Sequence, residues 1–289
     1  MAVLKNKIDF SVIFTVTRAN PNGDPLNGNR PRENYDGYGE MSDVSIKRKI
    51  RNRLQDMGEK IFVQSDDRNS DGCGSLKIRA EKNEALNALG KKPNREEYAR
   101  TACSEWFDVR AFGQVFALKG ETKGTGLSIP IRGPVSIQMA QSVSPVDIRT
   151  NKITSSVNNN KNVFNGELDS NRMGDKHYVD FGLYVFHGSI NVQLAEKTNF
   201  SEEDAEKIHR ALETLFENDC SSARPEGSME VRRVYWYKHD SKTPINSSAK
   251  VHRLLKVDLK EGIDRPRCFE DYEITLKPLE GLAPEIFKG

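Results

Sequence analysis

The sequence predicts an α+β protein whose centre is an antiparallel sheet interrupted by long polar excursions. With the polar stretches set aside, the elements follow in the order strand, helix, strand, strand, helix, strand. This is the order of ferredoxin-like folds, which also build RNA-recognition modules. The composition agrees, because a hydrophobic content of 36%, a charged content of 30% and a mean hydropathy of -0.68 describe a modest core under much polar surface. A chain of 289 residues suits one large domain or two modest ones.

The first elements are a strand and a helix joined by a long polar stretch. Residues 8–17 alternate apolar and polar side chains, which predicts a strand with one buried face and one open face. Residues 18–41 are rich in Asn, Gly and Pro, so this stretch is predicted to be an irregular loop of the kind that is usually functional or disordered. Ser42 or Asp43 then caps a helix. Its apolar stripe consists of Ile46, Ile50, Leu54 and Met57.

The same helix concentrates positive charge in a chain whose net charge is only +2. Lys47, Arg48 and Arg51 lie along one flank, whereas Lys49 and Arg53 lie along the other. Such a helix can pack by its apolar stripe and present cations to phosphates strung along its side. Charge alone is equally compatible with a solvated basic face. The surrounding sequence favours phosphate binding.

Beyond this helix, polar excursions alternate with apolar elements. Residues 58–105 are polar and rich in turn residues, which predicts an insertion. A second polar excursion between two strand-like stretches predicts the tip of an extended hairpin. Ser201 and Asp204 form a capping-box pattern at the start of a helix. After the insertion, the expected elements are an apolar stretch at 106–118, strands at 129–143 and 178–192, the helix at 201–216, and strand-like stretches at 229–239, 249–259 and 269–276.

The sequence contains no pattern typical of a catalytic or metal site, so we expect no enzyme, no metal and no cofactor. The histidines fall in different segments and form neither HExxH nor a Cys-His pattern. The four cysteines are too scattered for a CxxC knuckle and are interpreted as ordinary thiols. No stretch approaches the roughly 18 apolar residues of a membrane span, and the start of the chain lacks a signal-peptide pattern. We therefore expect a cytoplasmic protein without a membrane partner.

Six blocks, which follow one another from near the start of the chain to about residue 240, resemble a known family. That family is the backbone subunit of the type I CRISPR Cascade complex, in the RAMP superfamily, and the blocks are most similar to the type I-C branch. The blocks are NPNGDPLNGNRPR (20–32), SDVSIKRKIRN (42–52), FDVRAFG (107–113), RGPVSI (132–137), HYVDFGLYVFHGSIN (177–191) and SSARPEG (221–227).

The resemblance implies a modified ferredoxin-like, RRM-like palm with an inserted fingers region and a thumb hairpin. On this basis the expected divisions are palm at 1–57, fingers at 58–110, palm strands at 111–147, thumb at 148–178 and palm again at 179–289. The resemblance further implies a non-catalytic subunit that stacks head to tail with copies of itself along a CRISPR guide RNA. Together with other Cascade subunits, it would present the guide to target DNA in antiviral defence.

The resemblance also implies a set of RNA-binding residues. The SIKRKIR block would place Ser45, Lys47, Arg48 and Arg51 on the guide backbone, and the preceding loop would supply Asn20, Asn22, Arg30 and Arg32 to the same groove. Phe164 and Met173 are the apolar groups of the thumb region that could displace a base. Two further phosphate contacts are expected at Arg18 and Arg224. The alternatives are a salt bridge from Arg18 to Asp24 or Glu33, and capping of the preceding helix by Arg224.

A subunit that accepts any guide must bind phosphate and sugar rather than base edges. The open face of the first strand agrees, because Ser11, Ile13, Thr15 and Thr17 provide no aromatic platform. In the second long strand, Tyr178, Tyr184 and Phe186 share one face and either pack under an insertion or stack on bases. The excess of basic residues at 228–260 either lines a DNA path or protects strand edges.

Two other functions remain open from the sequence. One is a metal-independent endoribonuclease of the same superfamily that processes CRISPR precursor RNA, with His177 or His239 as acid or base. The other is a general single-strand binder unrelated to CRISPR.

Overall fold

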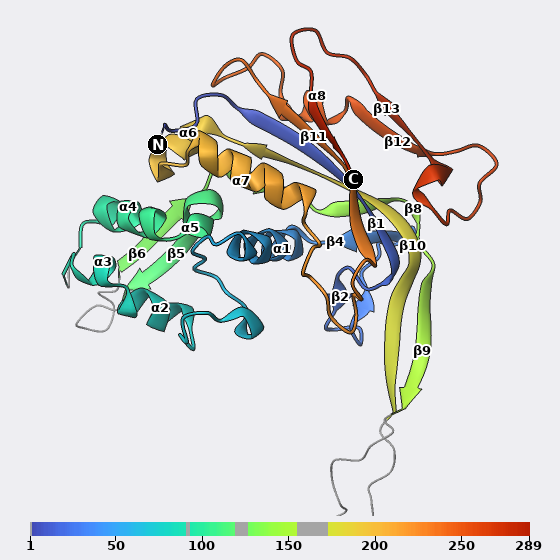
Figure 1. Cartoon of the computed structure of the whole chain (residues 1–289), viewed down its shortest axis with the longest axis horizontal. Helices are drawn as coiled ribbons and strands as arrows, with labels where there is room; N and C mark the ends of the chain where they lie inside the picture. Colours follow the sequence, from blue (N-terminus) through green and yellow to red (C-terminus); the bar gives the residue numbers. More distant parts are fainter. Residues whose placement is uncertain (1, 91–92, 119–126, 155–172) are drawn as a thin grey trace, which may run out of the picture.

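A large antiparallel sheet forms the centre of the molecule (Figure 1). The computed structural model describes residues 2–90, 93–118, 127–154 and 173–289. The strands of this sheet are β1 (Ile8–Ala19), β4 (Tyr38–Met41), β7 (Val135–Ile137), β8 (Ala140–Pro145), β9 (Ile148–Thr154), β10 (Met173–Ile190), β11 (Met229–Lys238) and β14 (Glu285–Lys288). They lie in the order β14-β11-β1-β10-β8-β4, and β7 and β9 also pair with β10. The predicted α+β class is therefore confirmed.

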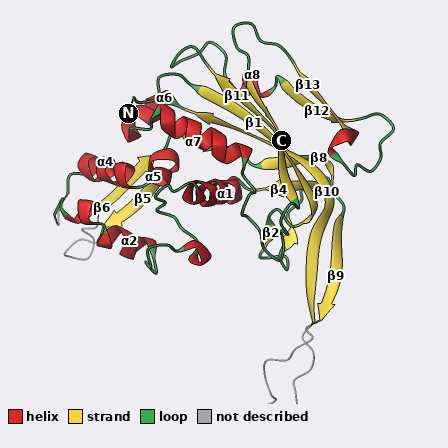
Figure 2. Ribbon diagram, viewed as in Figure 1, coloured by secondary structure: helices red, strands yellow, loops and turns green. Residues whose placement is uncertain are grey.

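One face of the sheet is covered by helices α1 (Asp43–Asp56), α6 (Val192–Thr198) and α7 (Glu202–Glu213), as Figure 2 shows. The predicted alternation in β1 puts Phe10, Phe14 and their neighbours on this face, where they pack against the helices. The predicted stripe of α1 is confirmed, since Ile46, Ile50 and Leu54 are fully buried and Met57 packs beside them. Ser42 caps α1, and Ser201 with Asp204 forms the predicted capping box of α7.

The opposite face of the sheet is covered by residues 245–282, here called the C-terminal lobe. The lobe contains α8 (Ser248–His252), β12 (Leu255–Leu259), the short 3-10 helix η2 (Phe269–Asp271) and β13 (Tyr272–Leu276). The predicted open face of β1 is therefore wrong for Ser11, Ile13 and Thr15, which are buried, while Thr17 is exposed. The reason is a second apolar cluster, in which Val251 and Tyr272 of the lobe pack with Ile13.

The C-terminal lobe also differs from its sequence prediction. The stretch 249–259 was predicted to be strand-like throughout, but its first part forms α8 and only its second part forms β12. β12 pairs with β13 in a separate two-stranded sheet, not with the central sheet. A run of apolar and basic residues of this length fits either element, and packing on the sheet decides between them.

Residues 58–132 form a helical insertion with its own core. It contains η1 (Asp66–Arg68), α2 (Leu76–Lys82), α3 (Glu84–Asn87), α4 (Arg95–Glu105), α5 (Phe107–Phe112), β5 (Gly113–Leu118) and β6 (Leu127–Arg132). Phe62 lies at the centre of this core, with its ring centroid 4.7 Å from that of Trp106 and 5.0 Å from that of Phe116. β5 and β6 pair with each other. Packing thus groups them with the insertion, whereas the sequence prediction assigned 111–147 to the palm.

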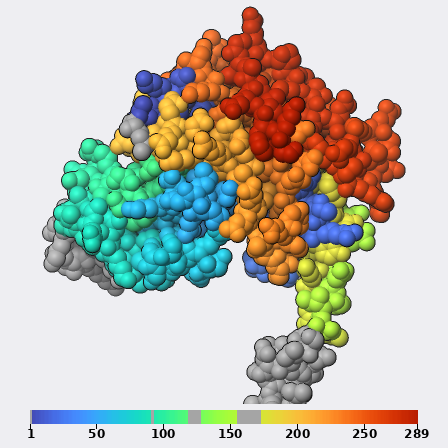
Figure 3. Space-filling view, in the orientation of Figure 1, coloured from blue at the N-terminus to red at the C-terminus, as the bar shows by residue number. Residues whose placement is uncertain are grey.

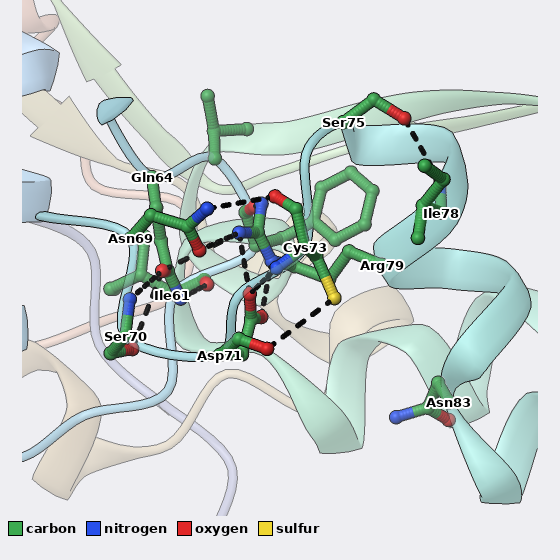
Figure 4. A network of polar contacts seen from close by, with 12 residues as sticks. Ile61, Gln64, Asn69, Ser70, Asp71, Cys73, Ser75, Ile78, Arg79 and Asn83 are labelled. Carbon is green, nitrogen blue, oxygen red and sulfur yellow. Dashed lines mark hydrogen bonds and ion pairs between the residues drawn. The ribbon is translucent and has the colours of Figure 1, made fainter. Parts of the chain in front are cut away.

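Arg79 holds the polar part of the insertion together (Figure 4). Its guanidinium is buried and donates to both carboxylate oxygens of Asp71, at 2.5 and 2.9 Å, and to the carbonyl oxygen of Phe62 at 2.8 Å. A further bond reaches Asn69 Oδ1 at 3.2 Å. The ion pair raises the pKa of Arg79 and holds the pKa of Asp71 well below its usual range. These bonds fix the segment that carries η1 beside α1.

The predicted irregular loop at 18–41 contains short strands. β2 (Gly23–Asp24) pairs with β3 (Arg30–Pro31), and β4 joins the edge of the central sheet by pairing with β8. Gly39 in β4 packs directly against Tyr184, because a Cβ atom there would lie 2.1 Å from the Tyr184 hydroxyl and would force that buried ring to shift. Elsewhere in the sheet, β9 and β10 form the antiparallel ladder of a long hairpin. The predicted tip of that hairpin lies outside the described residues.

Candidate nucleic-acid interface

A cationic groove of about 270 Å³ opens between α1, η1 and the segment after α7. Figure 3 shows the blue segment that contains α1 beside the orange segment after α7 on one face of the molecule. The groove is lined by Ser45, Arg48, Lys49, Asn52, Ser65, Asp67, Arg68, Asn218, Asp219, Cys220, Ser221 and Arg224. Four of these residues are cations and two are carboxylates, so the lining has a positive excess. It brings together Ser45, Arg48 and Arg224 from the predicted set.

Lys49 and Arg224 share one carboxylate in this groove. Asp219 Oδ2 accepts hydrogen bonds from Lys49 Nζ and, at 3.2 Å, from Arg224 Nε. The side chain of Lys49 is only 4% exposed. Burial lowers the pKa of its ammonium to about 8, and the Asp219 carboxylate offsets only part of that effect. The alternative of Arg224 as a cap of the preceding helix does not hold, since α7 ends at Glu213 and Arg224 bonds to Asp219 instead.

Arg48 and Arg68 form the other cationic wall. Arg48 Nη1 donates to the carbonyl oxygen of Val63 at 2.6 Å, and burial lowers the pKa of its guanidinium. Arg68 Nη1 donates to Asp56 Oδ1 at 2.6 Å, and its Nη2 donates to the carbonyl oxygen of Asn218 at 2.6 Å. Both guanidiniums keep unused N–H donors for an incoming anion, because each has five.

The remaining predicted cations of α1 lie outside the groove lining. Lys47 Nζ pairs with Asp43 Oδ2 of its own helix at 2.9 Å. Arg51 Nε donates to Asp108 Oδ2 at 2.9 Å, and its guanidinium lies 5.0 Å from the ring centroid of Phe112. The Arg51 side chain is 13% exposed. Both contacts of Arg51 are therefore with residues of the insertion, and they stabilise the fold.

Asn20 and Asn22 connect the 18–41 segment to the walls of the groove. Asn20 is buried, donates from Nδ2 to the carbonyl oxygen of Asn29 at 2.6 Å, and donates from its backbone N–H to Ala223 at 2.9 Å. Asn22 Oδ1 accepts the backbone N–H of Ser42 at 2.9 Å. Both side chains therefore position the segments that carry Arg224 and α1.

The three arginines of this segment differ in their partners. Arg30 pairs with Glu33 at 3.6 Å and Arg32 pairs with Asp24 at 3.3 Å. Both carboxylates that were considered for Arg18 are thus engaged by other residues. Arg18 is exposed, has a φ of +50°, and forms no ion pair with any residue in the described part of the chain.

Comparison with known proteins decides the family. A family model described as "CRISPR-associated protein Cas7" matches residues 6–277, which is most of the chain. This chain belongs to the Cas7 family. A CRISPR-associated protein Cas7 of Haloferax volcanii is 26% identical over 235 residues, and the match covers 75% of this chain and 66% of that protein. The chain thus spans just under two thirds of the length of that relative.

Two solved structures are also similar to this Cas7-family chain. One is a chain of a "CRISPR RNA-guided surveillance complex, pre-nicking", with a TM-score of 0.48, 14% identity, and coverage of 83% of this chain and 80% of that chain. The other is a chain of a "CRISPR RNA-guided surveillance complex", with a TM-score of 0.45, 15% identity, and coverage of 83% and 72%.

Two of the three β10 aromatic residues considered for base stacking are inaccessible in this Cas7-family chain. Tyr184 and Phe186 are fully buried in the main core, and the ring of Tyr184 stacks on Phe14 at 5.3 Å. The third, Tyr178, is half-buried on the β9-β10 hairpin, where its hydroxyl accepts a hydrogen bond from Asn151 Nδ2 at 3.4 Å. Of the two residues predicted to displace a base, Met173 is 78% exposed at the start of β10, opposite Thr154. Phe164 lies outside the described residues.

Half of the eight basic residues at 228–260 form ion pairs. Arg232, Lys238, Lys242 and Lys256 each form an ion pair with a nearby carboxylate. Arg253 and Lys260 are exposed and form no ion pair with a residue that the structure describes. Arg233 and Lys250 likewise form no ion pair with a described residue, since Arg233 donates to the carbonyl oxygen of Arg232 and Lys250 donates to Asn246 Oδ1. The region therefore keeps about half of the cations that its sequence suggests.

The histidines considered for catalysis lie apart from the groove. His239 is 3% exposed and bonds through Nε2 to Asp9 Oδ2 at 2.7 Å, beneath the C-terminal lobe. His177 lies on the β9-β10 hairpin, where Nδ1 bonds to Thr150 Oγ1 at 2.8 Å. Across the described ranges, no group of three or more His, Cys, Asp or Glu side chains could hold a metal ion. Within the same ranges, no helix is long and apolar enough to cross a membrane.

The sequence did not single out Arg68 or Asp219. Arg68 sits in a turn-rich stretch whose charges look solvated, and Asp219 is one of many acids near a helix end. Both reach α1 only because segments far apart in the chain fold together. No local pattern carries that information.

Proposed function

We propose that this chain is a non-catalytic backbone subunit of a type I CRISPR surveillance complex, which holds guide RNA by its sugar-phosphate backbone irrespective of sequence. The observation that carries the proposal is the groove in which Arg48, Lys49, Arg68 and Arg224 converge from three segments. Charge-assisted hydrogen bonds from guanidinium and ammonium groups suit phosphate oxygens. The groove offers no aromatic side chain for reading bases, so its chemistry favours the backbone.

The strand order supports a ferredoxin-like palm. β11, β1, β10 and β8 lie side by side and antiparallel, with α1 following β1 and α6 and α7 following β10 on the same face. This is the topology that strand-helix-strand-strand-helix-strand order produces. We assign the insertion at 58–132 to the fingers and the β9-β10 hairpin to the thumb, where Met173 and Phe164 would displace a base.

The wider assembly is part of the same proposal. Copies of this chain would stack head to tail along the guide, because an interface of two different surfaces propagates rather than closes. The bound guide would then pair with target DNA, and other Cascade subunits would complete the complex. The similarity of the sequence blocks to the type I-C branch makes that branch the first one to test.

Binding of single-stranded RNA by groove variants tests the proposal. Arg48→Ala and Arg224→Ala are each expected to weaken binding by about tenfold, because each removes a charged donor. The reduction should be equal for RNAs of unrelated sequence, and the salt slope should fall by roughly 0.7 for each phosphate that the variant no longer binds. Lys47→Ala should weaken binding less, since Lys47 lies outside the groove lining.

Arg253→Ala provides the matched control, because Arg253 is exposed on the C-terminal lobe and forms no described ion pair. It should leave binding unchanged. A reduction that depends on RNA sequence would contradict backbone binding. Cleavage of precursor RNA by the purified chain would contradict the non-catalytic assignment.

A further inference from the structure

Asp219 is a carboxylate in the lining of the cationic groove. Its side chain is 11% exposed, and one oxygen, Oδ2, accepts hydrogen bonds from both Lys49 and Arg224. Asp219 is therefore already paired with two of the four groove cations. Arg48 and Arg68 bond to backbone carbonyls, and Arg68 also pairs with Asp56.

The position of Asp219 is fixed by the backbone on either side of it. Arg68 donates to the carbonyl oxygen of the preceding residue, Asn218, at 2.6 Å. Asn218 has a φ of +58°, in the left-handed region that Asn tolerates better than most residues. On the other side, Ser221 and Arg224 exchange backbone hydrogen bonds at 2.8 and 3.0 Å. These backbone hydrogen bonds hold the Asp219 carboxylate at a fixed position in the groove.

A phosphate entering the groove would require the same two donors. Carboxylate and phosphate oxygens are alike as acceptors for ammonium and guanidinium groups. In the free protein, Asp219 balances the charge of Lys49, which is 4% exposed and would be costly to bury alone. When a phosphate arrives, two anions compete for one ammonium and one guanidinium.

We propose that Asp219 is an internal counter-ion that an RNA phosphate must displace from Lys49 and Arg224. It orders these two donors in the free protein and limits the affinity of the groove for phosphate. This inference rests on the proposed function, because it takes RNA phosphate as the incoming anion. Asp219 is thus a positioning residue whose removal tightens binding, which is the opposite of the effect expected for the cations around it.

The test compares the full chain with Asp219→Asn and Asp67→Asn for binding to an unstructured single-stranded RNA. Asp219→Asn should bind about tenfold more tightly at low salt, because it removes a negative charge within a few ångströms of the bound phosphate. Its salt slope should be steeper by roughly 0.7 for each cation released to phosphate. Asp67 lines the same groove but is exposed and bonds to neither Lys49 nor Arg224. Asp67→Asn should therefore change affinity by less than about threefold, because solvent screens it.

A second pair of variants keeps the test decisive if Asp219→Asn unfolds. Lys49→Met/Asp219→Leu replaces the buried pair by apolar groups, a change that is often tolerated. This double variant still frees Arg224, so it should bind RNA more tightly than Lys49→Met alone. Equal or weaker binding after removal of Asp219 in both backgrounds would overturn the inference.

The two proposals fail in different ways. If the unmodified chain does not bind RNA, or if Arg48→Ala leaves binding unchanged, the proposed function fails. If the unmodified chain binds RNA and Arg48→Ala weakens it, but removal of Asp219 does not tighten binding, only the counter-ion role of Asp219 fails.

Discussion

Asp108 is a single buried carboxylate that joins α1 to the insertion. Its Oδ1 accepts the backbone N–H of Phe62 at 2.7 Å, and its Oδ2 accepts the N–H of Val63 at 3.0 Å and Arg51 Nε at 2.9 Å. Val63 in turn accepts the hydrogen bond of Arg48. The orientation of a groove cation therefore depends on a carboxylate that does not line the groove.

This residue explains why the sequence could predict the basic helix but not the role of each cation. Lys47, Arg48 and Arg51 share a flank of α1, and spacing along a helix does not distinguish them. The difference comes from Asp108, which is 57 positions after Arg51 in sequence and is brought beneath it by the insertion. Which cation faces phosphate and which faces a buried acid is decided by tertiary structure.

Asp108→Ala is expected to lower the free energy of unfolding by about 3 to 5 kcal/mol, because it leaves Arg51 partly buried without a partner. Urea unfolding monitored by circular dichroism measures this change. Asp43→Ala breaks the more exposed pair with Lys47 and should cost no more than about 1 kcal/mol. Equal unfolding midpoints for the two variants would contradict the role of Asp108.

At the level of elements, the sequence was most informative where the pattern is local. The stripe of α1 and the capping box of α7 were predicted and are confirmed, and the alternation of β1 correctly predicted which of its residues face the helices. The predicted boundary at residue 110 differs from the packing, because the stretches at 106–118 and 129–143 give no sign of which sheet they join. β5 and β6 pair with each other, and Phe116 packs on Phe62 of the insertion.

Gly113 is the point at which α5 turns into β5, and it allows a direct test of that junction. Its φ is +81°, and a Cβ atom would lie 2.2 Å from the carbonyl oxygen of Ile131. Gly113→Ala should therefore cost at least ~2 kcal/mol and loosen the β5-β6 pair, from backbone strain and overlap together. Thermal unfolding and amide hydrogen exchange of the β5-β6 pair measure the two effects.

Gly74 is a suitable comparison within the same insertion, since a Cβ atom there would meet nothing within 4 Å. Gly74→Ala should leave both the unfolding temperature and the exchange of β5-β6 nearly unchanged. If Gly113→Ala behaved in the same way, the tight α5-β5 junction would not be important for the insertion.

On the scale of the whole molecule, the central sheet is covered on both faces, and the candidate site lies beside it. RNA-recognition modules use an exposed sheet face, and the polar face of β1 suggested one here. The C-terminal lobe instead buries Ser11, Ile13 and Thr15. Alternation along a strand shows which residues share a face, but only long-range docking shows whether another part of the chain covers that face.

The junction between the lobe and the sheet contains a cluster of histidines. His187 of β10 stacks on His252 of α8, with ring centroids 4.7 Å apart, and its Nδ1 bonds to Ser11 Oγ at 2.7 Å. Nearby, Asp9 bonds to His239 and lies 3.4 Å from Lys7. Burial lowers the pKa of His187 to about 4, helped by His252, and burial also lowers the pKa of His252.

These shifts make the stability of the molecule depend on pH. Because the pKa of His187 is lower in the folded chain than its ordinary value of 6.5, the unfolded chain binds the proton first as pH falls. Stability should therefore decrease between about pH 6.5 and about pH 4, by on the order of 3 kcal/mol from His187. Protonation charges one of two stacked rings at the junction, so the C-terminal lobe should loosen first. Urea unfolding across this range and hydrogen exchange of β12 and β13 measure both effects.

His187→Phe separates this effect from the titration of the carboxylates, because it keeps an aromatic ring against His252 and removes the titrating group. The unfolding free energy of His187→Phe should decline less steeply with falling pH than that of the unmodified chain. Its stability near neutral pH should be lower, because the hydrogen bond to Ser11 is absent. His177→Phe on the hairpin removes a histidine distant from the lobe and should retain the full slope. If the three proteins lost stability in parallel as the pH falls, the buried histidine pair would not govern the docking of the lobe. Carboxylates common to all three proteins would then account for the whole decrease of stability in acid.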